Sequence, residues 1–195
     1  MTLKQTPSQT VGPYFAYGLA PEQYRYDLQS VFTPAVATER AAGEAVTLVG
    51  QVLDGAGNPV NDALLEVLQA DAEGRYVQSA EQAQASGFSG FARCGTGTDP
   101  QNRFVIETIK PGAPAAGEAP RIDVILTMRG LLNHLFTRIY FDDEAAANVA
   151  DPVLESVPAE RRHTLIARRE TVAGRVVYRF DIRMQGDAET VFFDV

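Results

Sequence analysis

Apolar and polar residues alternate along two segments in the second half of the chain. In residues 122–129 and again in residues 176–184, every second position carries an apolar or aromatic side chain. Because successive side chains of a strand point to opposite faces of a sheet, this period of two predicts strands with one buried face. The inward positions are Ile122, Val124, Leu126 and Met128, then Val176, Tyr178, Phe180, Ile182 and Met184. The outward positions of the second segment are Arg179, Asp181 and Arg183.

Shorter apolar segments, separated by Gly, Pro, Asn and Asp residues, predict further strands. They cover residues 46–53, 63–70, 103–108, 135–141, 164–170 and 190–193. Two short helices are predicted, one over residues 142–148, which begin with acidic side chains, and one over residues 158–162 with Ser156 as N-cap. Residues 111–120 are rich in Pro, Gly and Ala and predict an exposed loop. This succession predicts an all-β fold, a β-sandwich of mostly antiparallel strands with one or two short helices.

The first 44 residues follow neither a strand period nor a helix period. They begin with a proline-containing, turn-forming segment over residues 6–14, and several Tyr and Phe residues follow it. A segment this rich in aromatic side chains is not expected to remain free in water. We therefore predict an extended N-terminal arm, residues 1–44, that packs on its own core or on a partner chain, and one β-sandwich domain over residues 45–195.

The composition fits a globular protein and argues against several classes of function. The 195 residues are 45% apolar and carry a net charge of −8, from 17 Lys and Arg against 25 Asp and Glu. Nucleic-acid binding needs a basic surface, which this charge balance does not favour. No apolar segment has the length of a signal-peptide core or a membrane span, so we expect a cytoplasmic protein. Cys94 is the only cysteine and is expected to be a buried, unreactive thiol.

The common catalytic motifs are missing from the sequence. There is no Gly-x-Ser-x-Gly motif, and residues 95–98 resemble a phosphate-binding loop only superficially. His134 and His163 are far apart and neither belongs to a histidine pair, so neither is expected to bind a metal. Arg129 ends an apolar strand, which places its guanidinium at the rim of a sheet, where it suits a carboxylate. Taken alone, such an arginine is more often simply solvated or salt-bridged.

Six ordered segments of the chain match one known family. They read Thr6-Pro-Ser-Gln-Thr-Val-Gly-Pro-Tyr14, Leu65-Glu-Val-Leu-Gln-Ala-Asp-Ala-Glu-Gly-Arg-Tyr76, Thr108-Ile-Lys-Pro-Gly112, Thr137-Arg-Ile-Tyr-Phe-Asp-Asp-Glu144, Tyr178-Arg-Phe-Asp-Ile-Arg183 and Glu189-Thr-Val-Phe-Phe-Asp194, with Gly186 between the last two. On these segments the chain resembles the intradiol ring-cleavage dioxygenases over nearly its whole length. Within that family it resembles the alpha chains of the members that cleave protocatechuate.

The resemblance implies a β-sandwich and a non-haem Fe(III) held by two tyrosinates and two imidazoles. In iron-bearing members the tyrosines follow the Gly-Arg-Tyr and Lys-Pro-Gly segments, and the histidines form a His-x-His motif. Here no tyrosine lies between Tyr76 and Tyr140, and Ala113 follows the Lys-Pro-Gly segment. Arg121 and Asp123 stand where the two histidines belong. We therefore expect no metal ligand and no catalytic residue in this chain.

The same resemblance implies a partner and a substrate. Alpha and beta chains of these enzymes form hetero-oligomers of αβ units, and the beta chain holds the Fe(III). The assembled enzyme inserts O2 into protocatechuate (3,4-dihydroxybenzoate) to give 3-carboxy-cis,cis-muconate. By the matching motifs, this chain is expected to complete the substrate pocket with Arg129 and with the Gly12–Pro13 turn of the arm.

Two other readings of the sequence remain open at this stage. The chain is alternatively a non-catalytic β-sandwich module, for binding or scaffolding, derived from the same family. A third reading is an autonomous dioxygenase whose iron ligands have moved to other positions.

Overall fold

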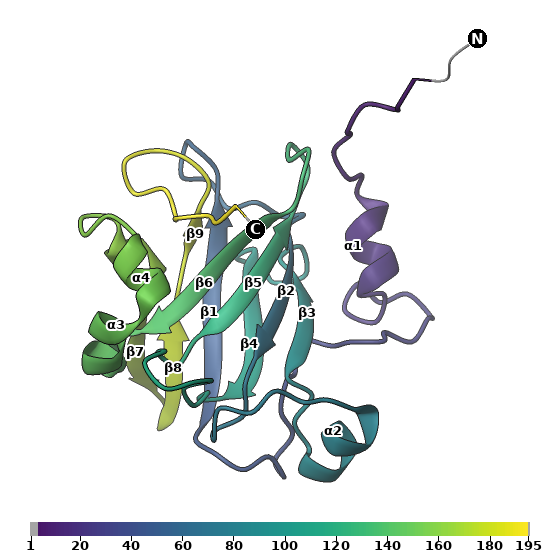
Figure 1. Cartoon of the computed structure of the whole chain (residues 1–195). Helices are drawn as coiled ribbons and strands as arrows, with labels where there is room; N and C mark the ends of the chain where they lie inside the picture. Colours follow the sequence, from purple (N-terminus) through teal and green to yellow (C-terminus); the bar gives the residue numbers. More distant parts are fainter. Residues whose placement is uncertain (1–3, 195) are drawn as a thin grey trace.

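The computed structural model describes residues 4–194, which form nine strands and a few short helices (Figure 1). The strands are β1 (Ala45–Leu53), β2 (Leu64–Gln69), β3 (Phe91–Gly95), β4 (Arg103–Ile109), β5 (Ile122–Thr127), β6 (Leu135–Phe141), β7 (Ile166–Val172), β8 (Arg175–Arg179) and β9 (Ile182–Arg183). The helices are α1 (Tyr14–Leu19), α2 (Ala80–Ser86), α3 (Ala145–Ala150) and α4 (Pro152–Ser156), with single 3-10 turns η1 (Asp142–Glu144) and η2 (Arg162–Leu165). The predicted all-β class is confirmed.

The strands pair in the order β3-β2-β5-β6-β7-β8-β1-β4, and β9 also pairs with β1. Only two residue pairs join β6 to β7, Tyr140 with Ile166 and Phe141 with Ala167. The sheet therefore consists of a group of four strands, β3-β2-β5-β6, and a group of five, β7-β8-β1-β4 with β9, which enclose the core between them (Figure 1). Most neighbours are antiparallel, whereas β1 runs parallel to β8 and β9, and β6 runs parallel to β7. The hydrogen-bonded strand order is continuous from one group to the other. The predicted arrangement as a two-layer sandwich therefore stays a prediction.

The core is built from the inward positions of the predicted alternation. Tyr178 and Ile182 are fully buried, and Ile122, Val124 and Leu126 are at most 1% exposed. They pack with apolar side chains from both strand groups in one continuous cluster. Burying such side chains is the dominant favourable contribution to folding, which explains why the period of two predicts these strands correctly.

A cluster of charged and aromatic side chains connects the two strand groups at the end where β4 and β6 finish. Lys110, directly after β4, lies 2.7 Å from Asp143 and 3.0 Å from Glu144, both in η1. The hydroxyl of Tyr178 on β8 donates to Asp143 at 2.9 Å, and Arg169 on β7 lies 3.6 Å from the same carboxylate. Since β6 and β7 share only two residue pairs, these contacts reinforce the narrow junction between the groups.

The predicted strand 176–184 is interrupted after β8. Asp181 turns its carboxylate to the backbone and accepts a hydrogen bond from Gln51 N–H at 3.0 Å, in place of a ladder bond. The chain approaches so closely here that a Cβ on Gly50 would lie 1.7 Å from the carbonyl oxygen of Phe180. The pairing with β1 resumes at Ile182 in the same register.

Several other predicted boundaries are wrong. The helix expected over residues 158–162 is absent from the described chain, and Ser156 ends α4 instead of capping a helix. The reason is an N-cap further upstream, where Asp151 precedes a proline at the first helical position. The predicted strand 190–193 is reduced to a single bridge between Phe193 and Phe136. The strand expected over residues 164–170 begins and ends two residues later, as β7.

The remaining differences concern elements that no strong pattern marked. Strand β3 and helices α1 and α2 were not predicted. The predicted loop over residues 111–120 is exposed only in its middle, because Pro111, Ala119 and Pro120 are buried. The helix expected over residues 142–148 is confirmed, as η1 followed by α3.

Asp151 organises the buried side of this helical region. One carboxylate oxygen accepts from the N–H groups of Val153 and Leu154 and from the hydroxyl of Tyr140, at 2.9–3.0 Å. The other accepts from Ala119 N–H at 2.9 Å. Burial by itself would raise the pKa of this carboxyl, but the four hydrogen bonds outweigh it and hold the pKa below its ordinary value. The charged form is therefore part of the folded structure.

We predict that Asp151→Asn lowers the free energy of unfolding by about 3 kcal/mol at neutral pH, because an amide cannot accept from all four donors. Since the folded-state pKa is depressed, the advantage of the wild type is complete above the unfolded pKa of about 4 and is lost as pH falls below it. Urea unfolding of both proteins at pH 7 and at pH 3.5 measures this, with Asp187→Asn in an exposed loop as the control. Equal stabilities at pH 7 would contradict the role given to Asp151.

Candidate functional site

Three strand ends meet at one corner of the first strand group. Leu64, which opens β2, pairs with Gly95 at the end of β3 and with Thr127 at the end of β5. Asp62 lies two residues before β2, and Arg129 lies two residues after β5. The register of three strands therefore brings these side chains together, although they are far apart in the sequence.

Arg129 forms an ion pair with Asp62 at this corner, through its Nε atom and the Oδ2 atom of the carboxylate. The arginine side chain is 56% exposed, whereas the aspartate side chain is 17% exposed. Within residues 4–194 no second carboxylate pairs with the guanidinium. As predicted, the guanidinium lies at the rim of the sheet, and the structure adds a salt bridge through Nε while more than half of the side chain stays exposed.

The N-terminal arm is attached to the same corner. The Thr10 hydroxyl accepts a hydrogen bond from Gly130 N–H at 2.7 Å and lies 3.4 Å from the carbonyl oxygen of Met128. Gly130 has a φ of +95°, a conformation that favours glycine and turns the chain directly after Arg129. Two residues beyond this contact, Gly12 and Pro13 are exposed, and Pro13 is the N-cap of α1. The structure thus brings the arm beside the Arg129 turn.

Residues 95–98, which resemble a phosphate-binding loop in sequence, serve to hold the arm. A Cβ on Gly95 would lie 2.2 Å from the hydroxyl oxygen of Tyr24, so the glycine leaves space for that ring. The Gln23 side-chain amide bonds both backbone groups of Gly95, accepting from its N–H at 2.8 Å and donating to its carbonyl at 2.7 Å. The glycines of this loop are therefore explained by the space that the Tyr24 ring occupies. Their presence does not indicate a phosphate-binding site.

The two positions at which the resemblance implies histidines, Arg121 and Asp123, belong to an ion-pair network. Arg121 is 8% exposed, lies 2.6 Å from Glu118 and is an ion-pair partner of Asp123 at 3.6 Å. Arg138 lies 2.9 Å from the same Asp123 carboxylate. Burial acts to lower the pKa of Arg121, but Glu118 and Asp123 outweigh it and raise the pKa, so the guanidinium stays charged. A buried cation that has no lone pair to donate does not suit Fe(III).

The positions at which the resemblance implies tyrosine ligands, after the Gly-Arg-Tyr and Lys-Pro-Gly segments, carry no phenol. No tyrosine lies between Tyr76 and Tyr140. Ala113 and Pro114 offer no side-chain donor. Within residues 4–194, no group of three or more His, Cys, Asp or Glu side chains could hold a metal ion.

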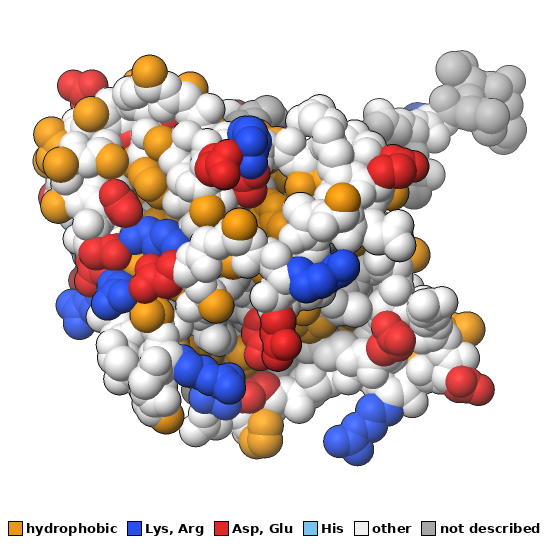
Figure 2. Space-filling model, turned by 90° about the horizontal axis from the view of Figure 1, so that it is seen from below, with side chains coloured by type: hydrophobic (Ala, Val, Ile, Leu, Met, Phe, Trp, Pro, Cys, Tyr) orange, Lys and Arg blue, Asp and Glu red, His pale blue; other side chains and the backbone are white. Residues whose placement is uncertain are grey.

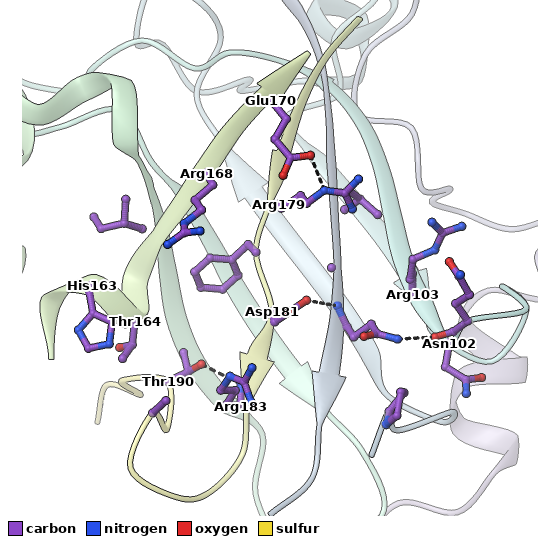
Figure 3. Close-up of a pocket in the computed structure, with 18 of the residues that line it drawn as sticks. Asn102, Arg103, His163, Thr164, Arg168, Glu170, Arg179, Asp181, Arg183 and Thr190 are labelled. Carbon is purple, nitrogen blue, oxygen red and sulfur yellow. Dashed lines mark hydrogen bonds and ion pairs between the residues drawn. The ribbon is translucent and has the colours of Figure 1, made fainter. Parts of the chain in front are cut away.

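Within residues 4–194, the two histidines and the cysteine form no hydrogen bond or ion pair with Arg129 or Asp62. His134 is exposed and packs edge-on against Phe136, and His163 is exposed near Arg168 (Figure 3). Cys94 is buried, and burial raises the pKa of its thiol to about 11, so a thiolate is scarce at neutral pH.

A cavity of about 860 Å³ lies over the outer side of β1, β4, β7, β8 and β9 (Figure 3). Its polar lining includes Arg103, Arg168, Arg179 and Arg183 together with Glu170 and Asp181. Arg179 is paired with Glu170 at 2.5 Å, and Arg103 is paired with Asp99 at 2.8 Å. None of the site residues predicted from the sequence lines this cavity, so it is a separate feature from the Arg129 corner.

Acidic and basic side chains are interspersed on the face seen in Figure 2, with apolar side chains between them. This mixture differs from the continuous basic surface that nucleic-acid binding needs. Among residues 4–194 there is no helix with the length and apolar character required to cross a bilayer.

Sequence reasoning missed two residues of the corner. Asp62 lies in a polar turn before a strand, where an aspartate is common and carries no functional signal. Thr10 belongs to a segment that matches the family, but nothing in the sequence pairs it with Gly130. The register of β2 with β5 brings Asp62 to Arg129, and the path of the folded arm brings Thr10 to Gly130.

Comparisons with known proteins show which family and which relatives the chain is similar to. Residues 11–130 match a family model described as Dioxygenase. The chain is 67% identical over 195 residues to the protocatechuate 3,4-dioxygenase alpha chain of Burkholderia cepacia, covering 100% of this chain and 99% of the relative. It is 35% identical over 165 residues to the beta chain from the same species, covering 78% of this chain and 69% of the relative.

A solved structure supports the fold. The dioxygenase domain of a carbohydrate-binding fusion protein from Streptomyces sp. SirexAA-E superposes with a TM-score of 0.60 at 23% identity, covering 92% of this chain and 97% of that one. At this identity the likeness concerns the fold alone. Together, the family match and the full-length relatives show that the chain belongs to the intradiol dioxygenase family, as its motifs predict.

Proposed function

We propose that this chain is the alpha subunit of a heteromeric enzyme that cleaves protocatechuate with O2 to 3-carboxy-cis,cis-muconate. The observation that carries the proposal is 67% identity over the whole chain to a protein named as an alpha chain, against 35% to the beta chain of the same species. In this proposal the chain completes the substrate pocket and performs no bond-breaking step of its own.

The iron of the assembled enzyme belongs to the beta subunit in this proposal. The family is iron-dependent. In this chain the corresponding positions carry the charged guanidinium of Arg121 and the ion-paired carboxylate of Asp123. A neighbouring guanidinium repels a metal cation, and the Arg138 contact occupies an oxygen of Asp123. These contacts support an alpha subunit that depends on its partner for the metal.

Arg129 supplies recognition of the substrate's carboxylate, with Gly12 and Pro13 forming the adjacent wall. Protocatechuate carries a carboxylate opposite its two hydroxyl groups, and a guanidinium binds a carboxylate through two parallel hydrogen bonds. The Thr10 contact with Gly130 supports this assignment, because it holds the arm beside Arg129 before any substrate arrives.

The arm itself is proposed to cover the partner subunit. Tyr14 is 78% exposed and Val31 is 81% exposed, which leaves a large apolar area in water when the chain is alone. In this arrangement residues 1–44 form the arm and residues 45–195 form the body, whose two strand groups act as the layers of a sandwich. The single buried Cys94, which forms no disulfide, fits the reducing environment of the cytoplasm.

Co-expression with the beta chain of the Burkholderia cepacia relative tests the proposal. We expect the purified complex to contain iron and to consume O2 when protocatechuate is added, and the chain expressed alone to do neither. An oxygen electrode and metal analysis measure both properties. Iron and turnover in the lone chain would indicate an autonomous dioxygenase, and failure to form any complex would favour a scaffold module.

Arg129→Ala is expected to raise the KM for protocatechuate about tenfold or more, since a charge-assisted hydrogen bond contributes about 1.5–3 kcal/mol. Catechol has no carboxylate, so its KM should change much less. The matched control is Arg175→Ala, which removes an exposed arginine at the start of β8. Steady-state kinetics of the complex with both substrates measure the difference, and equal losses for the two would show that Arg129 has only a structural role.

A further inference from the structure

We infer that Asp62 is a positioning residue, which holds the Arg129 guanidinium so that its free edge faces the carboxylate of the substrate. The inference deepens the proposed function and rests on it. The observations that carry it are the ion pair itself, the rigid backbone on which Asp62 stands and the exposure of Arg129.

The backbone on both sides of Asp62 is fixed by one buried side chain. The Thr96 hydroxyl donates to the carbonyl of Val60 at 2.7 Å and lies 3.2 Å from the N–H of Ala63, which donates to it. Thr96 N–H in turn donates to the carbonyl of Ala63 at 3.0 Å. Thr96 is fully buried, so these bonds are shielded from water. Asp62 therefore extends from a backbone segment with little freedom to move.

Thr10 bonds the backbone on both sides of Arg129, but the long side chain of Arg129 has less support than that of Asp62. Arg129 follows the last residue of β5 by two positions, precedes a glycine and has more than half of its side chain exposed. A long side chain in that setting samples many rotamers. Fixing it on ligand binding then costs conformational entropy, which weakens the affinity. The contact with Asp62 fixes the arginine before binding and so reduces that cost.

The contact with Asp62 uses Nε, so the edge of the guanidinium formed by the two Nη atoms is left for a ligand. Asp62 bonds Nε, on the side of the planar group, while the two Nη atoms form its end. A carboxylate can fork onto that end without displacing Asp62. The backbone next to Arg129 is also tied to the arm, because Thr10 bonds Gly130, so the proposed pocket wall and the cation lie on connected segments.

Asp62 also has an opposing effect, since its negative charge reduces the attraction between Arg129 and an anion. Two variants separate the effects. Asp62→Asn removes the charge but keeps an oxygen that can accept from Nε, whereas Asp62→Ala removes both the charge and the contact. If positioning dominates, the alanine variant is the worse binder. If charge reduction dominates, both variants bind protocatechuate more tightly than the wild type.

The test uses the complex with the beta chain and measures KM for protocatechuate and catechol, and the anaerobic Kd of protocatechuate. We expect Asp62→Ala to raise both protocatechuate constants about fivefold, Asp62→Asn to raise them less, and the catechol KM to change far less than either. Asp187→Ala, which removes an exposed aspartate from the loop after β9, is the matched control. Unchanged or lowered protocatechuate constants in both Asp62 variants would overturn the inference.

A double variant distinguishes positioning from a general structural role. In an Arg129→Ala background, Asp62→Ala should have no further effect on protocatechuate binding, because the group that it positions is gone. A full additional loss there would also overturn the inference. An inactive wild-type complex would instead contradict the proposed function, whereas a complex that responds to Arg129→Ala but not to Asp62→Ala would contradict only the role of Asp62.

Discussion

A guanidinium keeps its positive charge at every pH at which a protein is folded, and two arginines give this chain its chemical character through that property. At position 121, where the family resemblance implies a metal-binding histidine, the charge is buried and neutralised by Glu118 and Asp123. At position 129 the charge lies at the rim of the sheet, where Asp62 is its one carboxylate partner among residues 4–194. The first arginine is incompatible with a cation, and the second attracts an anion. The proposed division of labour between two subunits follows from this contrast.

The sheet determines where the second arginine lies. Strand β2 pairs with both β3 and β5, so the residues before β2 and after β5 occupy one corner. The arm reaches the same corner through Thr10 and through Gln23, which uses its side-chain amide to bond the edge strand β3. The arm is thus positioned by hydrogen bonds to strand ends, by Val36 in the main core and by Phe32 packed on Phe91. An irregular segment held in this way can contribute to the proposed pocket.

The sequence predicts those parts of the fold in which one face of an element is buried. Residues 122–129 and 176–184 alternate because water is excluded from one side of each strand, and their inward side chains are buried as expected, except for Met128, Val176 and Met184, which are partly buried. Helix α4 was misplaced because its N-cap, Asp151, acts through backbone hydrogen bonds that hydrophobic periodicity does not reveal. Strand β3 is short and contains Ala and Gly, which carry little β signal. The site follows the same division: Arg129 is visible at the end of an apolar strand, whereas its contact with Asp62 depends on strand register and cannot be seen in either local sequence.

The measurement that tests the central claim most directly is the position of bound protocatechuate in a crystal structure of the complex with the beta chain. The account predicts a substrate carboxylate within about 3 Å of the Arg129 Nη atoms, Asp62 still bonded to Nε, and iron bound only by residues of the beta subunit. A substrate carboxylate bound elsewhere while Arg129 points into solvent, or a metal ion at Arg121 and Asp123, would contradict it.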